Sequence, residues 1–82
     1  MAPFLHYIME HRNPAMTKFI SMIINLRNNL NNGNDSLDQF ILDVLSGIEP
    51  EQALWDNRHG LGLPLYIRCL EIIHFCGVER RA

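Results

Sequence analysis

Two cysteines and a histidine near the end of the chain have side chains that could bind a metal ion. Cys69, His74 and Cys76 lie within one short segment, and His59 precedes them. Zinc sites use thiolate and imidazole pairs about two to five residues apart whose side chains converge. On a helix, Cys69 and His74 would point about 140° apart, and the two cysteines would stand about two turns apart. The spacing therefore favours structural thiols over a metal site, and we expect no cofactor.

The same spacing bears on the redox state of the two thiols. On a helix the Cα atoms of Cys69 and Cys76 would be roughly 10 Å apart along the axis, whereas a disulfide needs Cα atoms within about 7 Å. We therefore expect buried free thiols. Because free thiols are typical of reducing compartments, we also expect a cytoplasmic protein. A disulfide between two subunits is the alternative.

Catalytic and anion-binding patterns are the next candidates. The histidines and carboxylates form none of the spacings that bring together a nucleophile, a base and an orienting group, so we expect no enzyme. Gly60-Leu61-Gly62 precedes a helix and follows Arg58 and His59, where backbone N–H groups could hold a phosphate. No Gly-Lys-Ser/Thr follows, and Pro64 removes one donor. A glycine turn between helices is therefore the favoured interpretation.

Charge is distributed unevenly along the chain. Residues 1–34 carry +2, residues 35–57 carry −6 and residues 58–82 carry +2, which sum to the −2 of the whole chain. The acidic middle is either internal complementarity with helix-dipole matching or a face that steers a basic partner. On the second interpretation, aromatic side chains would anchor the contact. The partner-binding residues would be Asp35, Asp38, Asp43, Glu49, Glu51, Trp55, Asp56 and Tyr66.

Hydrophobic periodicity predicts helices in the first half of the chain. A short helix is expected over roughly residues 3–12, because the residue before Pro14 disfavours the α region. Residues 15–32 place apolar side chains on one broad face at 100° per residue. Pro14 suits the first position of this helix, and Gly33 suits the left-handed position after it.

Capping residues predict where the later helices begin. Ser36 and Gln39 match a capping box with serine at the N-cap, and Gly47 would end that helix. The next helix would start at Glu49-Pro50, with proline at its first position, and run to about Asn57. Residues 58–62 are expected to be a loop.

The last expected helix, over residues 63–77, is apolar nearly all round. Only Arg68, Glu71 and His74 interrupt its apolar side chains strongly. These charges exclude a membrane span, which needs about 20 predominantly apolar residues. A helix of this kind is normally surrounded, yet so short a chain has little material to surround it. The helix is therefore either the centre of the bundle or meets a second subunit or partner on one side.

Length and composition limit the fold and the class of protein. The chain has 82 residues and 9.5 kDa, 48% of them apolar and 20% charged, which is the balance of one globular domain. We expect a single all-α domain over residues 1–82, a compact bundle of four or five short helices with 15–32 and 63–77 as its main pair. A net charge of −2 argues against binding nucleic acid by bulk charge.

Function is predicted only in outline. Apolar residues outnumber the places to bury them, so we expect a homodimer or a partner-bound protein. The expected function is a small non-enzymatic regulator, an inhibitor or adaptor of a larger machine, with the general build of phage-encoded inhibitors. The alternative is a helix-turn-helix-like DNA-binding regulator over residues 37–76, although its turn is too long and its last helix lacks a polar face for base edges. Its phosphate contacts would be Lys18, Arg58, Arg68, Arg80 and Arg81.

Overall fold

The computed structural model describes residues 13–79, and over these residues the chain is helical without strands. The all-α fold expected from the sequence is therefore confirmed. The helix expected over residues 3–12 lies outside the described residues. The described helices are α2 (Pro14–Asn28), α3 (Asp35–Leu45), α4 (Pro50–Asp56), α5 (Arg58–Leu61) and α6 (Leu63–Cys76).

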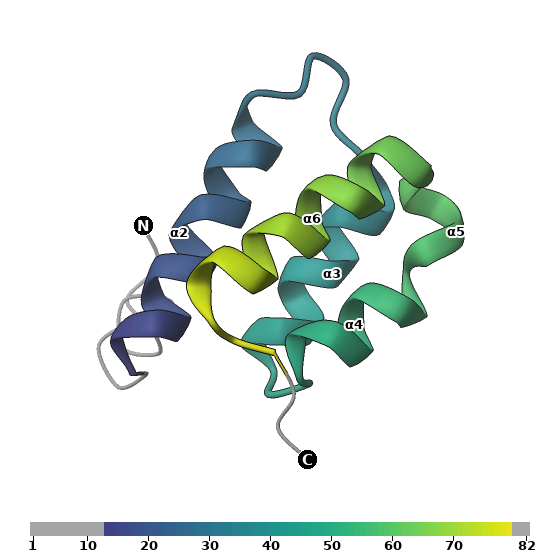
Figure 1. Ribbon diagram of the computed structural model, residues 1–82. Coiled ribbons are helices and arrows are strands. Elements are labelled where there is room, and N and C mark those ends of the chain that lie inside the picture. The colour runs from purple at the N-terminus through teal and green to yellow at the C-terminus, as the bar shows by residue number, and fades with distance from the viewer. Residues whose placement is uncertain (1–12, 80–82) are drawn as a thin grey trace.

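Helices α2 and α6 form the most extensive helix–helix contact, as expected for the main pair. Figure 1 shows α6 in front of α3, with α4 and the single turn of α5 leading from α3 round to the start of α6. Helix α3 also packs against α2, α4 and α5. One side of α6 therefore faces the other helices, and its opposite side faces away from them.

The core is formed by the apolar side chains that these helices direct at one another. Phe19 of α2 and Phe40 of α3 meet edge to face, with ring centroids 6.1 Å apart and planes at 82°. Burial of each such side chain stabilises the fold by roughly 1.5–3 kcal/mol. The other buried hydrophobic residues are Ile20, Ile23, Leu37, Val44, Ala53, Leu54, Leu61, Cys69, Ile72, Ile73, Cys76 and Val78.

Helix α2 begins as predicted and ends earlier than predicted. Pro14 is its first residue, and the Asn13 side chain accepts a hydrogen bond from the Met16 N–H at 2.8 Å. The helix ends at Asn28 rather than at residue 32. The asparagines that follow are poor helix formers, because their side chains compete with the helix for backbone hydrogen bonds. Gly33 does adopt a left-handed conformation, with φ +67°, but within the loop.

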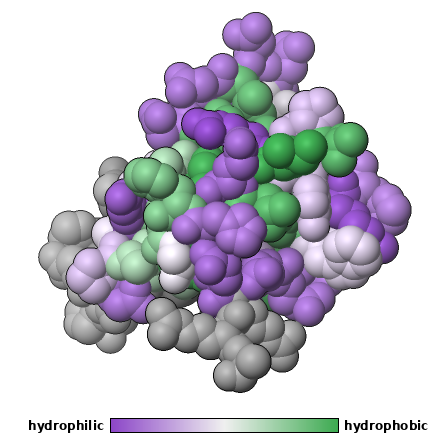
Figure 2. Space-filling model, viewed as in Figure 1, coloured by the Kyte–Doolittle hydropathy of each residue, from purple (hydrophilic) through white to green (hydrophobic). Residues whose placement is uncertain are grey.

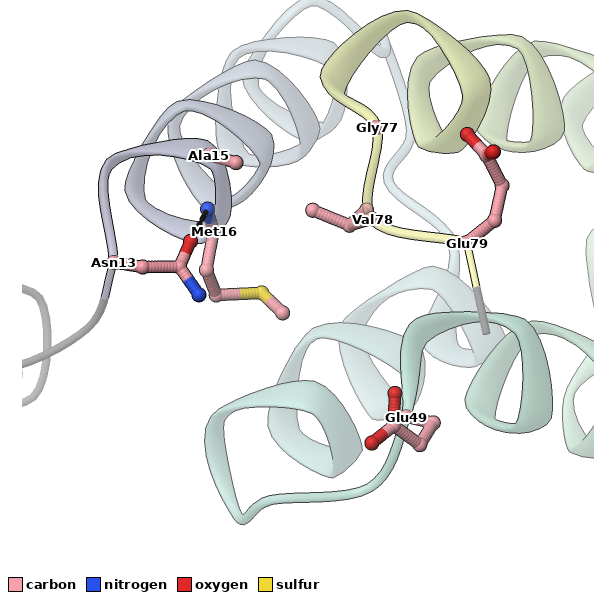
Figure 3. A pocket seen from close by; sticks show the side chains of 7 residues that line it. All are labelled: Asn13, Ala15, Met16, Glu49, Gly77, Val78 and Glu79. Carbon is pink, nitrogen blue, oxygen red and sulfur yellow. Dashed lines mark hydrogen bonds between the residues drawn. The ribbon is translucent and has the colours of Figure 1, made fainter. Parts of the chain in front are cut away.

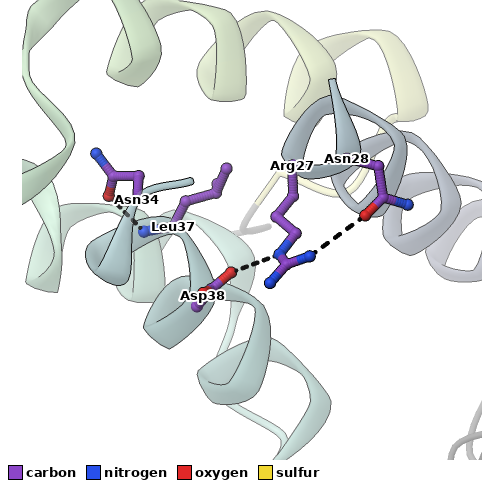
Figure 4. Close-up of polar contacts among 5 residues, drawn as sticks. All are labelled: Arg27, Asn28, Asn34, Leu37 and Asp38. Atoms are coloured by element: carbon purple, nitrogen blue, oxygen red, sulfur yellow. Dashed lines mark hydrogen bonds and ion pairs between the residues drawn. The ribbon is translucent and has the colours of Figure 1, made fainter. Parts of the chain in front are cut away.

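The capping box predicted at the start of α3 is wrong. The N-cap is Asn34, whose side-chain oxygen accepts the Leu37 N–H at 2.9 Å (Figure 4). Gln39 donates instead to Asp43 one turn later, at 2.8 Å. Asparagine caps a helix as well as serine does, so the cap lies two residues earlier than Ser36. The helix ends at Leu45, and Gly47 follows with φ +108°.

Residues 58–62 are not simply a loop, as the sequence suggested. Helix α4 begins at Pro50 as predicted and ends at Asp56, and residues 58–61 then form the short helix α5. The Asn34 side chain donates to the Gly60 carbonyl at 3.2 Å, so packing on α3 holds this glycine-containing turn in helical form. Leu61 is buried beneath it.

Helix α6 has the bounds that the sequence predicts. It follows Gly62 and ends at Gly77, which adopts the left-handed conformation with φ +66°. The N–H of Gly77 donates to the His74 carbonyl at 3.1 Å, and that of Val78 donates to the Ile73 carbonyl at 3.2 Å. These bonds satisfy carbonyls that a helix end leaves without partners. No helix over residues 13–79 is long and apolar enough to cross a membrane.

Candidate functional site

Helix α6 has one apolar side in the core and a second apolar side in solvent. Cys69, Ile72, Ile73 and Cys76 are buried. On the opposite side Leu63 is 69% exposed, Ile67 47% and Phe75 67%. Together with Glu71, these three occupy positions four residues apart, so they follow a single row along the helix. We call Leu63, Ile67, Glu71 and Phe75 the α6 row.

Trp55 lies beside the N-terminal end of this row. Its side chain is 54% exposed, and the Arg58 guanidinium lies 3.8 Å from the centre of its ring. Arg58 also donates to the Trp55 carbonyl at 2.7 Å. A hollow of about 240 Å³ forms here, lined by Trp55, Arg58, Gly62, Leu63 and Tyr66. The hydrogen bond to the Trp55 carbonyl holds the Arg58 guanidinium against the indole ring. This contact favours one position of the ring at the rim of the hollow.

A second hollow lies at the C-terminal half of the row. It measures about 360 Å³ and is lined by Met22, Arg68, Glu71, Ile72 and Phe75. The ammonium of Lys18 in α2 lies 4.3 Å from the centre of the Phe75 ring. Arg68 and Glu71 approach to 3.7 Å, both well exposed, and an exposed ion pair of this kind contributes little stability. These side chains are therefore available to other partners.

Exposed apolar side chains and cations together make one surface. We define the outer face of α6 as the α6 row with Trp55, bordered by three cations. Figure 2 shows hydrophobic side chains over α6 on the side that faces the viewer, with hydrophilic side chains between them. Exposed apolar side chains grouped on one side of a helix, here with the charged Glu71 among them, are typical of interaction sites. The bordering cations are Lys18, Arg58 and Arg68.

The acidic residues predicted to bind a partner lie elsewhere, on or just before α3 and α4. Asp38 accepts a hydrogen bond from Arg27 of α2 at 2.9 Å (Figure 4). This short pair raises the pKa of the Arg27 guanidinium, because the hydrogen bond and the charge of Asp38 favour its protonated form. Asp38 is thus matched by charge within the chain.

Hydrogen bonds within the chain hold two further acidic residues. Asp43 accepts from Gln39 at 2.8 Å and from Asn57 at 3.1 Å. Asp56 accepts from Gln52 at 2.8 Å. These bonds favour the interpretation that part of the charge of the acidic segment is matched by groups within the same chain.

The remaining acidic residues lie at the starts of two helices. Asp35 belongs to the first turn of α3, Glu51 belongs to the first turn of α4, and Glu49 is the N-cap of α4. Negative charge is favourable at these positions, because the N-terminal end of a helix carries a partial positive charge. Dipole matching therefore accounts for this part of the acidic segment.

The structure thus separates the predicted partner-binding residues into two groups. The aromatic anchors Trp55 and Tyr66 both line the hollow at the start of α6, whereas the carboxylates lie on or just before α3 and α4, with only Asp56 directly beside Trp55 in the chain. The cations assigned to the DNA-binding alternative are better grouped, because Lys18, Arg58 and Arg68 all border the outer face of α6. The remaining two, Arg80 and Arg81, lie outside the described residues.

The thiols and the histidines are the remaining candidates for chemistry within residues 13–79. Cys69 and Cys76 are free and buried, as the sequence predicts. Burial raises the pKa of the Cys69 thiol from 9.0 to about 11 and raises that of Cys76 as well. His59 and His74 are exposed. In this part of the chain no three His, Cys, Asp or Glu side chains are placed to hold a metal ion together.

A further hollow lies between the start of α2, the residue before α4 and the segment after α6 (Figure 3). It measures about 730 Å³, and Figure 3 shows Met16 and Val78 directed into it from two sides. Two carboxylates, Glu49 and Glu79, also line it.

Comparison with protein-family models, with curated proteins and with solved structures gives no match for this chain. The functional argument therefore rests on the outer face of α6. Sequence reasoning missed Leu63, Ile67 and Phe75 as functional residues, although it recognised that their helix was apolar nearly all round. Their spacing of four could not single them out, because the buried pairs Cys69/Ile73 and Ile72/Cys76 have the same spacing.

Proposed function

We propose that this chain is a small non-enzymatic regulatory protein, an inhibitor or adaptor of a larger assembly, that acts by binding protein through the outer face of α6. The observation that carries this proposal is the exposure of Leu63, Ile67 and Phe75 on one side of a helix whose other side is core. Single exposed apolar residues are ordinary, but a row of three beside an exposed tryptophan is not.

The energetics favour a protein partner for this surface. Burial of each large apolar side chain on binding is worth roughly 1.5–3 kcal/mol before the costs of association. Tryptophan and arginine are the side chains that most often dominate interface energy, and Trp55 and Arg58 lie stacked at one end of the row. The carboxylates of α3 and α4 would add long-range steering of a basic partner.

Site-specific photo-crosslinking in the native cell tests the proposal. A benzophenone amino acid replaces Ile67 in one variant and Gln39, an exposed residue of α3, in a control. We expect a defined crosslinked protein from position 67 and none of that mass from position 39. Absence of any adduct specific to position 67 would contradict the proposal.

One observation favours a second function, the DNA-binding alternative over residues 37–76. Lys18, Arg58 and Arg68 border the same face, and cations grouped on one side bind phosphates. This function predicts duplex DNA affinity that falls steeply as salt rises, and that weakens in Arg58→Ala and Arg68→Ala. If duplex DNA is not retarded in a gel at low salt, the DNA-binding alternative is wrong.

We also propose that the protein works in the cytoplasm. Cys69 and Cys76 are free thiols, and free thiols persist in reducing compartments. Detection of either cysteine in an intermolecular disulfide in protein taken directly from cells would contradict this location.

A further inference from the structure

We propose that the outer face of α6 binds a second copy of this chain, forming a two-fold symmetric homodimer. The two α6 helices run antiparallel and cross obliquely. Phe75 of each copy enters the hollow beside Trp55 of the other. The proposal rests on the proposed function, because it names a second copy of this chain as the protein that the outer face of α6 binds.

The positions along α6 are self-complementary about a single point. Leu63 and Phe75 are twelve positions apart, about 18 Å along a helix, and their midpoint is position 69. In an antiparallel two-fold pair, a residue six positions before the midpoint faces the residue six positions after it in the other copy. Phe75 of the second copy therefore faces Leu63 and the hollow that Leu63 lines with Trp55, and the same contact forms again at the other end.

The inclination of the α6 row sets the crossing angle. Residues spaced four apart form rows inclined to the helix axis, and two such rows lie parallel when the helices cross at about 50°. This is the commonest way in which helices pack in globular proteins. The exposed residues Leu63, Ile67 and Phe75 belong to one such row, so the row can remain in contact with its copy along its length.

Charge agrees with nearly the same midpoint. About position 69, Glu71 of one copy comes opposite Ile67 of the other and next to its Arg68, so an Arg68 lies beside a Glu71 across the interface twice per dimer. Within one copy their charged atoms are 3.7 Å apart and both side chains are more than half exposed, so each can reach across. Lys18 and Arg58, which lie at opposite ends of the row, would come to the same end of the dimer and repel. Added salt therefore weakens the attraction between Arg68 and Glu71 and also reduces the repulsion between Lys18 and Arg58.

The expected affinity is modest. A standard interface buries about 800 Å² on each partner, whereas the 14 residues of α6 extend only about 21 Å. We expect a dissociation constant in the micromolar range. Measurement at about 100 µM protein should then place most chains in dimers.

Charge reversal tests the intermolecular pairing in the full chain. Arg68→Glu and Glu71→Arg each place like charges opposite one another in a homodimer, so each variant alone should dimerise at least about tenfold more weakly. When the two variants are mixed in equal amounts, the two carboxylates of one face the two guanidinium groups of the other across the interface, and the dimer should return. Gln39→Arg, which introduces a charge at an exposed position on α3, is the control and should dimerise as the parent does.

Light scattering measures the mass of each sample, and circular dichroism shows that each variant stays helical. We expect a mass approaching 19 kDa, twice the 9.5 kDa chain, for the parent and for the mixture, and a clearly lower mass, closer to 9.5 kDa, for each charge variant alone. A parent that stays at the mass of one chain, or a mixture no heavier than its components, overturns the homodimer. If the parent is monomeric while position 67 still crosslinks to another protein, the homodimer fails and the proposed function stands.

Discussion

Ser36 of α3 lies against Gly60 of α5 so closely that a Cβ placed on Gly60 would overlap the Ser36 hydroxyl and stand 2.7 Å from its Cβ. Asn34 strengthens the same contact, because its side chain caps α3 and also donates to the Gly60 carbonyl at 3.2 Å. The start of α3 thus holds α5 in place. Since α5 carries Arg58 and leads into α6, this contact positions the hollow on which the functional proposal depends.

Substitution of Gly60 tests this close approach. We expect Gly60→Ala to lower the free energy of unfolding by about 1–3 kcal/mol, because the new methyl group has no space against Ser36. Ser36→Ala removes the overlapping hydroxyl and should restore part of the loss in the double variant. Urea titration measures both effects. An equal loss in His59→Ala, one residue away and exposed, would show that the close approach is not the cause.

The two roles of Asn34 can be separated by two substitutions. Asn34→Ala removes both the cap and the bond to Gly60 and should cost about 1 kcal/mol or more. Asn34→Asp keeps an oxygen that can accept from the Leu37 N–H but cannot donate to Gly60, so its loss should be smaller. Thermal unfolding compares them with Ser36→Ala, which should change stability by less than about 0.5 kcal/mol. A larger loss of stability in Ser36→Ala would indicate that Ser36, and not Asn34, caps α3.

Sequence reasoning predicted α4 and α6 closely, because proline at the first position and glycine after the last are local signals that the structure keeps. It placed the end of α2 too late, since Leu30 continued the apolar period through asparagines that favour leaving the helix. It missed α5, because the helical form of His59 and Gly60 depends on packing against Asn34 and Ser36, more than twenty residues earlier in the chain.

The candidate site was less predictable than the fold. A helix that is apolar nearly all round gives no indication of which side will be buried. The choice is made by the helices that pack against α6, chiefly α2 and α4, and Cys69, Ile72 and Ile73 are buried in the folded chain. Leu63, Ile67 and Phe75 are what those partners leave uncovered.

Two isoleucines on opposite sides of α6 provide a matched test of its two faces. Ile73 is fully buried and Ile67 is 47% exposed. At concentrations where the chain is monomeric, Ile73→Ala should destabilise the fold by about 2–5 kcal/mol, whereas Ile67→Ala should change it by about 0.5 kcal/mol or less. Chemical denaturation measures both. Similar losses at the two positions would contradict the placement of Ile67 in solvent.

Stability should fall in alkali because of Cys69. Burial raises the pKa of this thiol from 9.0 to about 11, so between those values the unfolded chain has lost a proton that the folded chain retains. Unfolding is then favoured increasingly from about pH 9 to about pH 11 and levels off above. The difference in stability between the parent and Cys69→Ala should shrink over this window. A difference that is constant with pH would contradict the burial of the thiol.

Sedimentation equilibrium of the parent chain tests the central claim, that the outer face of α6 binds a second copy. We predict a mass that rises from 9.5 kDa toward twice that value as protein concentration increases from about 1 to about 200 µM. In Phe75→Asp, which places a charge where the hollow beside Trp55 would receive a ring, the mass should remain near 9.5 kDa. A parent mass equal to that of one chain at every concentration would contradict the claim.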